Sequence, residues 1–503
     1  MSPPPRAAEP GTLAALQARY GARYRWLLLL SVMVGTMASV MSSTVVNVAI
    51  PDLSRHFVLG QERAQWVTSG FMVAMTVSML TTPWLLARLG YRRTYALCMG
   101  LLLVGGIGGG LAGAFWLVLL ARVAEGLAAG VVQPIPAIII LRAFGPEEQG
   151  RASGLFGMGV VLAPALGPSI GGVLVDAFGW RSIFFMVVPF CLLSLWLAQR
   201  YVPVTAPGGV SAGAAAGARF DGVGLLLASG ATLALLNGLV ALHGGPAAEA
   251  ATLLVGAAAA VAGFVAWQRR LLRRQAHPGA HGAAATPPLM NLRLFKHRPF
   301  AFGAIVAFIY GTALFGSTYL LPVYMQMGLG LAPAYVGTIL LPAGIVLAVA
   351  IALVGRLADR RPAHRLVSLG LALLAASFAL MPTLGPASAM GWLVAYAILG
   401  RIGLGFILPS LNLGAMRGIA HELIPQGSSV INFMRMLGGA VGVSLCGILL
   451  EWRLAAHGET LAPAHSAASA ARLAAFDEVF VVLAALCLLA LTAAWQMRAR
   501  PGA

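Results

Sequence analysis

The chain has 503 residues, of which 59% are hydrophobic and only 10% are charged, and it carries a formal net charge of +18. Soluble domains have about 25% charged residues, so this composition excludes an ordinary water-soluble fold. The positive charge does not indicate a nucleic-acid partner, because the basic residues are spread over short loops instead of forming one soluble patch.

Apolar runs of about 20 residues recur along nearly the whole chain, and each is long enough to cross a bilayer as a helix. The runs are continuously apolar, whereas the strands of a membrane barrel alternate polar and apolar residues. The sequence therefore predicts an all-α integral membrane protein. Fourteen spans are expected, in chain order at 26–50, 65–87, 94–115, 117–141, 152–176, 182–202, 221–242, 250–269, 299–326, 335–357, 365–386, 389–415, 427–450 and 477–496.

The charged loops predict how these spans are oriented. If the N-terminus is cytoplasmic, the inside segments hold 25 Arg and Lys residues and the outside loops hold five. Cytoplasmic loops are those that carry excess Arg and Lys, so we expect both termini to be cytoplasmic. The predicted parts are a cytoplasmic tail 1–25, a six-helix bundle 26–202, a linker 203–219, a two-helix insertion 220–269, a basic cytoplasmic loop 270–298, a second six-helix bundle 299–496 and a cytoplasmic tail 497–503.

The two six-span blocks contain similar segments at corresponding positions. "WLLARLGYRR" (84–93) corresponds to "VGRLADRRPAHR" (354–365), and "RVAEGLAAGVVQP" (122–134) corresponds to "RIGLGFILPSLN" (401–412). Secondary transporters are built from such repeats, which hold a central site between two moving halves. The repeats therefore favour a transporter over a receptor or a structural membrane protein.

Three motifs make a family resemblance specific. The first span ends in "TVVNVAIP" (44–51), the fifth contains "APALGPSIGGVLVDAFGWRSIFF" (163–185), and the ninth leads into "YLLPVYMQMGLGLAPAYVG" (319–337). Together with the order of the spans, these motifs resemble the major facilitator superfamily, and within it the fourteen-span drug:proton antiporters of the EmrB/QacA type. The resemblance implies two six-helix bundles with two additional spans between them, and proton-coupled drug efflux across the inner (plasma) membrane.

The fifth-span motif predicts a close contact between helices. Its glycines leave a helix face without side chains, and its prolines remove backbone donors and bend the helix. We expect this segment, at the junction of the two bundles, to seal the protein during a conformational switch; a packing seam without a gating role is the alternative. The motif residues are Pro164, Gly167, Pro168, Gly171 and Gly172.

The resemblance also implies a pair of interface loops, one in each half. Their motif residues are Arg88, Gly90, Arg92, Gly355, Asp359 and Arg360. In the first loop, Pro83 and Ala87 stand where the family usually has Gly and Asp. That acid would pair across the bundle interface and latch one state, so the first half is expected to lack this latch.

Glu125 is the only one of the 15 acids that lies well inside a predicted span. Arg122 precedes it by three residues and shares its helix face. The resemblance implies a part for Arg122 in proton coupling, and Ser42 stands where the family usually has an acid. We expect Glu125 to replace that acid as the proton carrier; a static ion pair that makes Arg122 tolerable in the membrane is the alternative.

Other polar side chains at membrane depth are candidates for the substrate cavity, although each also suits an interhelical hydrogen bond. Arg122 and Arg401 set against one acid would disfavour cations, so we expect neutral or weakly acidic lipophilic substrates. The candidate cavity residues are Asn47, Gln133, Tyr310, Gln326, Arg401, Asn412 and Asn432.

The sequence thus predicts a multidrug exporter that moves lipophilic small molecules in exchange for protons by alternating access. A dedicated exporter of one endogenous metabolite and a non-transporting membrane sensor or scaffold are the alternatives. Some members of the family work with a periplasmic adaptor protein, for which the outside loop 452–476 would be the docking segment. The chain has no nucleotide-binding loop and no metal-ligand cluster, so we expect neither an enzyme activity nor a cofactor.

Overall fold

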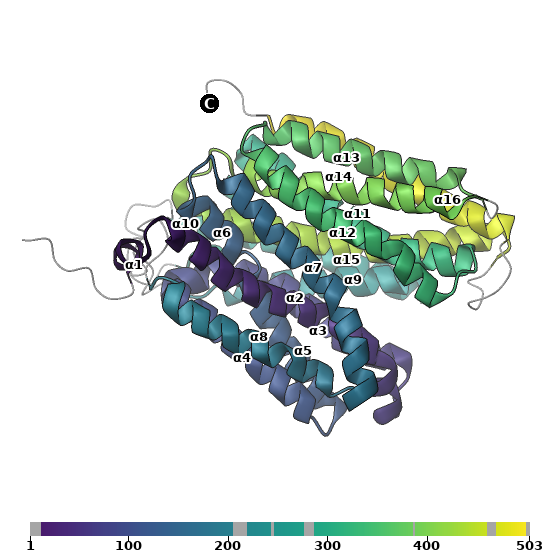
Figure 1. The fold of residues 1–503 in the computed structure, drawn as a ribbon, viewed down its shortest axis with the longest axis horizontal. Coiled ribbons are helices and arrows are strands. Elements are labelled where there is room, and N and C mark those ends of the chain that lie inside the picture. The colour runs from purple at the N-terminus through teal and green to yellow at the C-terminus, as the bar shows by residue number, and fades with distance from the viewer. Residues whose placement is uncertain are drawn as a thin grey trace, which may run out of the picture.

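The computed structural model describes residues 12–204, 219–242, 246–275, 286–385, 388–459 and 469–498. This part of the chain is almost entirely helical and contains no strand (Figure 1). Twelve of its segments are long and apolar enough to cross a membrane, which makes the chain a multi-pass membrane protein. Most of the predicted linker 203–219 lies outside the described residues, as does the middle of the basic loop 270–298.

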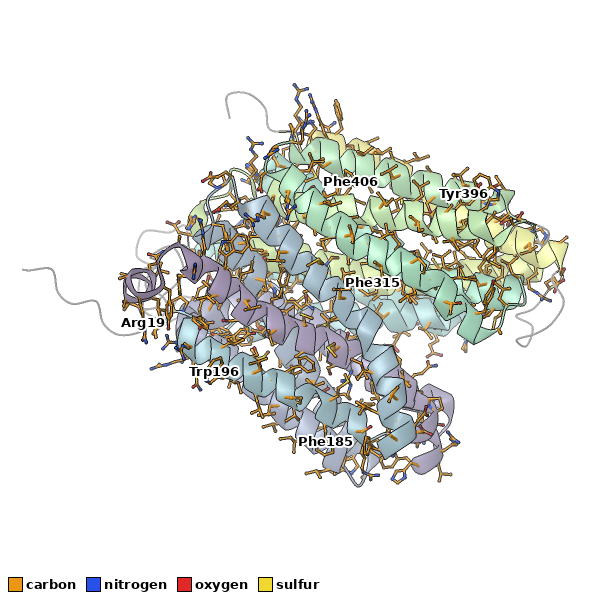
Figure 2. All side chains as sticks on the ribbon, viewed as in Figure 1. Arg19, Phe185, Trp196, Phe315, Tyr396 and Phe406 are labelled. Carbon is orange, nitrogen blue, oxygen red and sulfur yellow. The ribbon has the colours of Figure 1, made fainter. Side chains whose placement is uncertain are left out.

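The first half of the chain forms one group of packed helices, named here the first bundle. Within it α2 packs against α7 and α8, and α5 packs against α3 and α4. Phe185 and Trp196 point away from the bundle (Figure 2) and are 39% and 55% exposed, as expected for a lipid-facing surface. After the short helix α1 (Leu13–Tyr20), the bundle consists of α2 (Tyr24–His56), α3 (Gln61–Ser78), α4 (Thr82–Leu111), α5 (Phe115–Val132), α6 (Ile135–Ala143), α7 (Gln149–Phe178) and α8 (Ser182–Tyr201).

The chain reverses direction inside α4, at Gly90. This residue has φ 77° and ψ 172°, a conformation that glycine adopts readily and other residues rarely do. Thr94 Oγ1 donates a hydrogen bond to the carbonyl oxygen of Leu85 at 3.0 Å. In an unbroken helix these two residues would lie about 13 Å apart along the axis. The 49-residue apolar segment Arg63–Leu111 is therefore not one straight helix.

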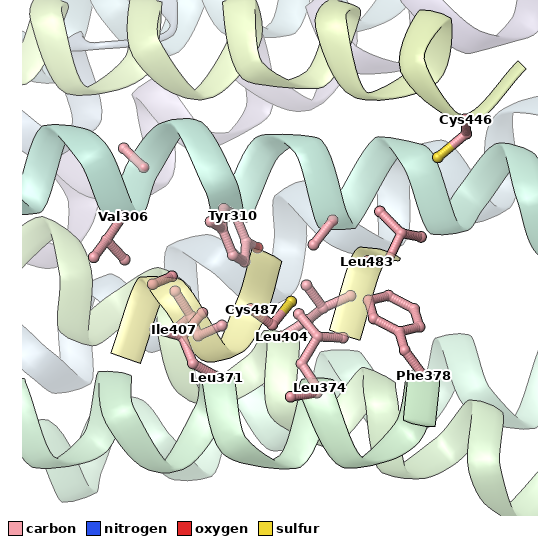
Figure 3. Packing of buried hydrophobic residues seen from close by; sticks show 14 of the residues in the cluster. Val306, Tyr310, Leu371, Leu374, Phe378, Leu404, Ile407, Cys446, Leu483 and Cys487 are labelled. Atoms are coloured by element: carbon pink, nitrogen blue, oxygen red, sulfur yellow. The ribbon is translucent and has the colours of Figure 1, made fainter. Parts of the chain in front are cut away.

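The second half forms another group, named here the second bundle. In it α11 packs against α15, and α13 packs against α14 and α16. Figure 3 shows its core, where buried apolar side chains from these helices meet, among them Tyr310, Phe378, Leu404 and Cys487. The helices are α11 (Arg298–Val323), α12 (Pro333–Ala358), α13 (Ala363–Leu380), α14 (Met390–Met416), α15 (Ile424–Ala456) and α16 (Ala470–Gln496), with a π-helical turn, η5 (Tyr324–Gly328), after α11.

A helical hairpin, α9 (Gly222–Ala241) and α10 (Ala247–Gln275), lies between the bundles in the sequence. Besides packing on each other, its helices contact both bundles, because α9 packs against α3 and α15. The buried Asp221 fixes the hairpin by accepting hydrogen bonds from Trp267 Nε1 at 2.7 Å and Gln268 Nε2 at 2.8 Å.

The two bundles meet where α7 crosses α12. A Cβ atom at Gly355 would lie 2.5 Å from the Cα of Gly154, and one at Gly154 would lie 2.8 Å from the Cα of Gly355. Both distances are too short for any side chain, so glycine on each helix allows the close contact. From this contact the bundles diverge toward the right-hand end of the molecule (Figure 1).

Candidate functional site

The centre of the first bundle holds a buried ion pair. Arg122 and Glu125, both on α5, are 1% and 0% exposed. Arg122 Nη1 is ion-paired with Glu125 Oε2. The three-residue spacing places both side chains on one helix face, as the sequence predicted.

Ser42 on α2 joins this pair to a second helix. Its Oγ donates to Glu125 Oε2 at 3.0 Å and accepts from Arg122 Nη1 at 2.7 Å. The position where the family usually has an acid is thus in direct contact with the acid that this chain does have. Ser42, Arg122 and Glu125 are named here the buried triad.

A third helix completes the surroundings of the triad. Arg122 Nε donates to the carbonyl oxygen of Val67 at 3.3 Å, and the guanidinium carbon lies 4.2 Å from the centre of the Phe71 ring. An aromatic face attracts a cation, so α3 contributes to holding the charged group away from water.

Two atoms of the triad have no hydrogen-bond partner among the described residues, Glu125 Oε1 and Arg122 Nη2. Glycines on α4 make the space beside them. A Cβ at Gly105 would lie 2.5 Å from Glu125 Cγ, and one at Gly106 would lie 3.6 Å from Oε1. An unpaired buried carboxylate oxygen is costly, and binding a proton or a water molecule would relieve that cost.

A second polar site lies between the bundles. Gln133 from the first bundle and Asn412, Asn432 and Arg435 from the second line one cavity of about 40 Å³. This volume holds one to a few water molecules, whereas drug-sized ligands occupy about 300–1,000 Å³. The cavity is therefore closed to a large substrate in this conformation. Arg435 was not among the predicted cavity residues.

The other predicted cavity residues lie in different parts of the molecule. Tyr310 on α11 is close enough to Arg401 and Arg435 to interact electrostatically with both guanidinium groups. Asn47 and Gln326 do not line the cavity. Asn47 Oδ1 accepts a hydrogen bond from Thr68 Oγ1 at 3.0 Å, and Gln326 lies in the π-helical turn after α11.

The bundles also share an apolar contact next to the triad. Phe71 and Met75 of α3, and Met79 directly after it, pack with Met436 of α15, and Phe315 of α11 packs against this cluster. Figure 2 shows Phe315 in the region between the two bundles. Phe71, whose ring lies against Arg122, therefore belongs to an apolar cluster that also contains residues of the second bundle.

The glycines of the fifth-span motif pack within one bundle. A Cβ at Gly167 would lie 2.8 Å from Thr44 Oγ1, and one at Gly171 would lie 2.3 Å from Val45 Cγ2, both on α2. These glycines thus face α2 of their own bundle, whereas α7 contacts α12 of the second bundle through its earlier turns, at Gly150 and Gly154. The sealing role expected for the motif stays a prediction.

The other motif positions add little to this contact. A Cβ at Gly172 would meet no atom within 4 Å. Pro164 and Pro168 are part of α7, which runs as one helix from Gln149 to Phe178, and their side chains lie outside the described ones.

In the second interface loop, Asp359 connects the two bundles. Its carboxylate accepts hydrogen bonds from the backbone amides of Gly150 at 2.5 Å and Arg151 at 3.0 Å, at the start of α7. Helix N-termini favour negative charge because their first amides lack partners within the helix. We name this contact the Asp359 latch. Arg360, next to it, is exposed.

In the first interface loop, Arg88 and Arg92 contact residues of their own bundle. The Arg88 guanidinium carbon lies 5.2 Å from the ring centre of Trp84, and Arg92 Nε donates to the carbonyl oxygen of Val202 at 2.7 Å. Gly90 provides the chain reversal. Arg142 Nη2 reaches the other bundle instead, by donating to the carbonyl oxygen of His421 at 2.7 Å.

The Major Facilitator Superfamily model matches residues 32–443. The chain belongs to the Major Facilitator Superfamily. One relative is a multidrug resistance protein B homolog from Mycobacterium tuberculosis, 30% identical over 444 residues, which are 86% of this chain and 78% of the relative. Another is a tetracenomycin C resistance and export protein from Streptomyces glaucescens, 28% identical over 431 residues, which are 85% of this chain and 76% of the relative. These relatives support a drug-efflux family within the superfamily.

Solved structures agree with this superfamily fold. The human organic anion transporter MFSD10 has a TM-score of 0.62 at 15% identity, covering 93% of this chain and 99% of that one. The proton:xylose symporter XylE has a TM-score of 0.61 at 11% identity, covering 94% and 95%. At these identities the likeness shows the fold alone. Superfamily members are transporters rather than enzymes, and the described residues contain no group of three metal-ligating side chains.

One acid of this superfamily member lies deeper than the sequence indicated. The last span was predicted to begin at 477, whereas α16 begins at Ala470. Asp477 is thus two turns inside the helix, and its Oδ1 is buried without a hydrogen-bond partner among the described residues. The segment before it, "HSAASAAR" (465–472), is polar, so hydropathy alone does not show where the helix begins.

Proposed function

We propose that this protein is a proton-coupled exporter of lipophilic small molecules, with neutral or weakly acidic substrates favoured. The buried triad carries the proposal, because an acid held at membrane depth implies a partner or a task. Arg122 is the partner of one carboxylate oxygen, and the other, Glu125 Oε1, is left unpaired. That free oxygen supports the role of Glu125 as the proton carrier.

The proposed coupling follows from the contacts of the triad. In the charged form, Glu125 Oε2 pairs with Arg122 and accepts from Ser42, which ties α5 to α2. A proton on Oε1 neutralises the carboxyl group and removes the counter-charge that the buried guanidinium needs. The contacts among α2, α3 and α5 then favour another arrangement, and Phe71 transmits the change to the apolar cluster shared with Met436.

Alternating access is supported by where the bundles touch. The Asp359 latch and the contact of Gly154 with Gly355 hold one end of the molecule together. Release of these contacts would open that end while the other end closes, as in a rigid-body movement of two bundles around a central site. The gating role of Gly167 and Gly171 would then lie in keeping α7 close to α2.

We further propose fourteen spans, two bundles divided at the predicted boundaries, and cytoplasmic termini in an inner (plasma) membrane. Twelve segments qualify as spans by length and composition. The reversal at Gly90 divides Arg63–Leu111, and the largely apolar α7 is a further helix of 30 residues. The excess of Arg and Lys in the inside segments supports the orientation.

We also propose a periplasmic adaptor protein as a partner. The docking segment predicted for it, 452–476, lies outside the described residues at 460–468. A dedicated exporter of one metabolite is a second candidate, which the name of the Streptomyces relative favours.

The test is transport by the purified full-length protein in proteoliposomes with an imposed pH gradient. A panel of lipophilic cations, neutral molecules and acids would be assayed with and without a protonophore. We expect gradient-driven export of several neutral or acidic compounds, abolished by the protonophore. Export of one compound alone would favour the dedicated exporter. Export of quaternary cations without acids would contradict the substrate preference, and no transport of any compound would contradict the function.

A further inference from the structure

The second bundle contains two arginines at membrane depth that lack an acidic partner. Arg401 is the twelfth of the 27 residues of α14, and Arg435 is the twelfth of the 33 residues of α15. Each therefore lies roughly 16 Å from the start of its helix. Because the two helices run in opposite directions, Arg401 lies about 22 Å and Arg435 about 16 Å from the turn that joins them, which places both well inside the helix pair.

The contacts of these arginines leave most of their donors unused. Arg435 Nη2 donates to Asn432 Oδ1 at 2.9 Å. Arg401 has no hydrogen bond or ion pair to any described residue, although Tyr310 interacts electrostatically with both groups. A guanidinium group has five donors, so the pair offers a forked set of donors to whatever occupies the space before it.

No described acid forms an ion pair with either arginine. Glu125 is already paired with Arg122 in the first bundle. Of the 15 acids, only Glu9 and Glu62 have side chains outside the described ones, and they belong to the N-terminal tail and to the first turn of α3. Asp477 of α16 is buried without a hydrogen-bond partner among the described residues, but no ion pair joins it or any other described acid to Arg401 or Arg435.

Arg435 is accessible from the cavity between the bundles. Both arginines are half-buried despite their depth, and Arg435 lines that cavity together with Gln133, Asn412 and Asn432. A charged group at this depth is retained only with a partner or a task. Among the described residues neither arginine has an acidic partner, which points to a negatively charged ligand.

We propose that Arg401 and Arg435, with Tyr310 and Asn432 beside them, form a binding site for the carboxylate of an organic acid, so that the transported substrate is a lipophilic anion. Guanidinium groups bind carboxylates through two parallel hydrogen bonds, and Tyr and Asn side chains supply further donors. This inference rests on the proposed export function and narrows its substrate class from neutral or weakly acidic molecules to ionised acids.

The proposal assigns different tasks to the two bundles. The first binds the proton at Glu125, and the second binds the anion at Arg401 and Arg435. A proton that moves inward and an anion that moves outward carry charge in the same direction. A membrane potential that is negative inside should therefore drive export of the acid even without a pH gradient, and drive it more steeply than export of an uncharged analogue.

The first test is binding to the purified full-length protein, measured as a shift in melting temperature and by calorimetry. The probes are matched pairs, such as 1-naphthoate and 1-naphthamide, at a pH where the acid is ionised. We expect the carboxylate to bind at least about tenfold more tightly than the amide, and Arg401→Gln and Arg435→Gln to remove this preference. Arg417→Gln, at an exposed arginine after α14, is the control and should keep it.

A second readout separates ligand binding from a structural role. Removing an unpaired buried charge should raise the melting temperature of the ligand-free protein in Arg401→Gln, whereas removing a structural contact would lower it. Equal binding of acid and amide, binding of no carboxylate in the panel, or an equal shift with chloride alone would overturn the proposal.

Different results would contradict the anion site and the proton carrier. Binding is measured without a proton gradient, so Glu125→Gln should keep the preference for the carboxylate. If that variant also keeps gradient-driven export while Arg401→Gln loses the preference, the anion site stands and the proton carrier is wrong. If acid and amide are exported equally by a gradient that Glu125→Gln cannot use, the reverse holds.

Discussion

At the scale of single residues, the structure gives Ser42 a role that the sequence does not indicate. In the sequence, Ser42 stands in the first span where the family usually has an acid. In the structure its hydroxyl contacts both Arg122 and Glu125, so it supports the acid that has moved to α5. A neutral residue here leaves Arg122 with one carboxylate partner instead of two.

Ser42→Ala should weaken the triad. The change removes two hydrogen bonds to buried charged groups, and we expect a loss of roughly 1–3 kcal/mol in stability together with slower gradient-driven transport. Ser43→Ala is the matched control, because Ser43 Oγ bonds only to the carbonyl oxygen of Val40 in its own helix. Thermal unfolding in detergent and transport in proteoliposomes would measure both. Equal behaviour of the two variants would show that Ser42 does not support the triad.

The sequence could predict some of these residues and not others. The shared face of Arg122 and Glu125 follows from helical spacing alone. Contact with Ser42 does not, since the residues are 83 positions apart and no local pattern relates α2 to α5. Arg435, which lines the cavity, was not among the predicted cavity residues.

At the scale of elements, the latch of the two halves is asymmetric. Asp359 in the second interface loop bonds to the start of α7, whereas Ala87 stands at the matching position of the first loop. The sequence predicted the missing acid but not its consequence for the interface. Which helix start Asp359 meets depends on the packing of α7 against α12, and that is a tertiary property.

Asp359→Ala should open the latched end. It leaves the amides of Gly150 and Arg151 without their acceptor, which should shift the equilibrium toward the open form by about 0.5–2 kcal/mol. Spin labels at Arg93→Cys and Arg365→Cys, both exposed, would report the distance between the bundles. Arg361→Ala, at an exposed neighbour, should leave the distances unchanged. An unchanged distance in Asp359→Ala would show that the Asp359 latch does not stabilise the closed form.

The latch should also depend on pH. Burial raises the pKa of Asp359 above its usual range, while the amides of Gly150 and Arg151 act in the opposite direction. In the open form the carboxyl group would be exposed and its pKa would return toward the usual value. The latched form therefore binds the proton more tightly, so it gains as the pH falls through the raised pKa and loses as the pH rises through it.

The same spin labels test this sign. The latched population should increase in the wild-type protein as the pH is lowered from neutral toward the usual pKa of an aspartate. Asp359→Asn keeps an acceptor for the amides but cannot titrate, so its distances should not change over this range. A latched population that decreases on acidification, or the same response in Asp359→Asn, would contradict the assignment.

At the scale of the whole molecule, sequence and structure differ mainly in how segments meet. The all-helical membrane fold follows from long apolar runs, and the superfamily match confirms it. Gly167 and Gly171 make their close contacts with α2 of their own bundle. Glycine predicts close approach without naming the partner helix, so this part could not be predicted.

The two bundles have different roles in the proposed exchange of a proton for a substrate. The first holds the one buried acid that is paired with a buried arginine, and the second holds two arginines without an acid among the described residues. The apolar cluster of Phe71 and Met436 lies between them. Exchange of a proton for a substrate then requires that Glu125 changes its protonation state during each cycle.

The most direct test of this requirement is to compare uphill transport with exchange in Glu125→Gln proteoliposomes. The variant mimics the protonated acid, so it should lose accumulation driven by a pH gradient while keeping exchange of labelled for unlabelled substrate, which needs no net proton movement. Glu422→Gln, at an exposed acid, should keep both activities. Gradient-driven accumulation at the wild-type rate in Glu125→Gln would contradict the central claim.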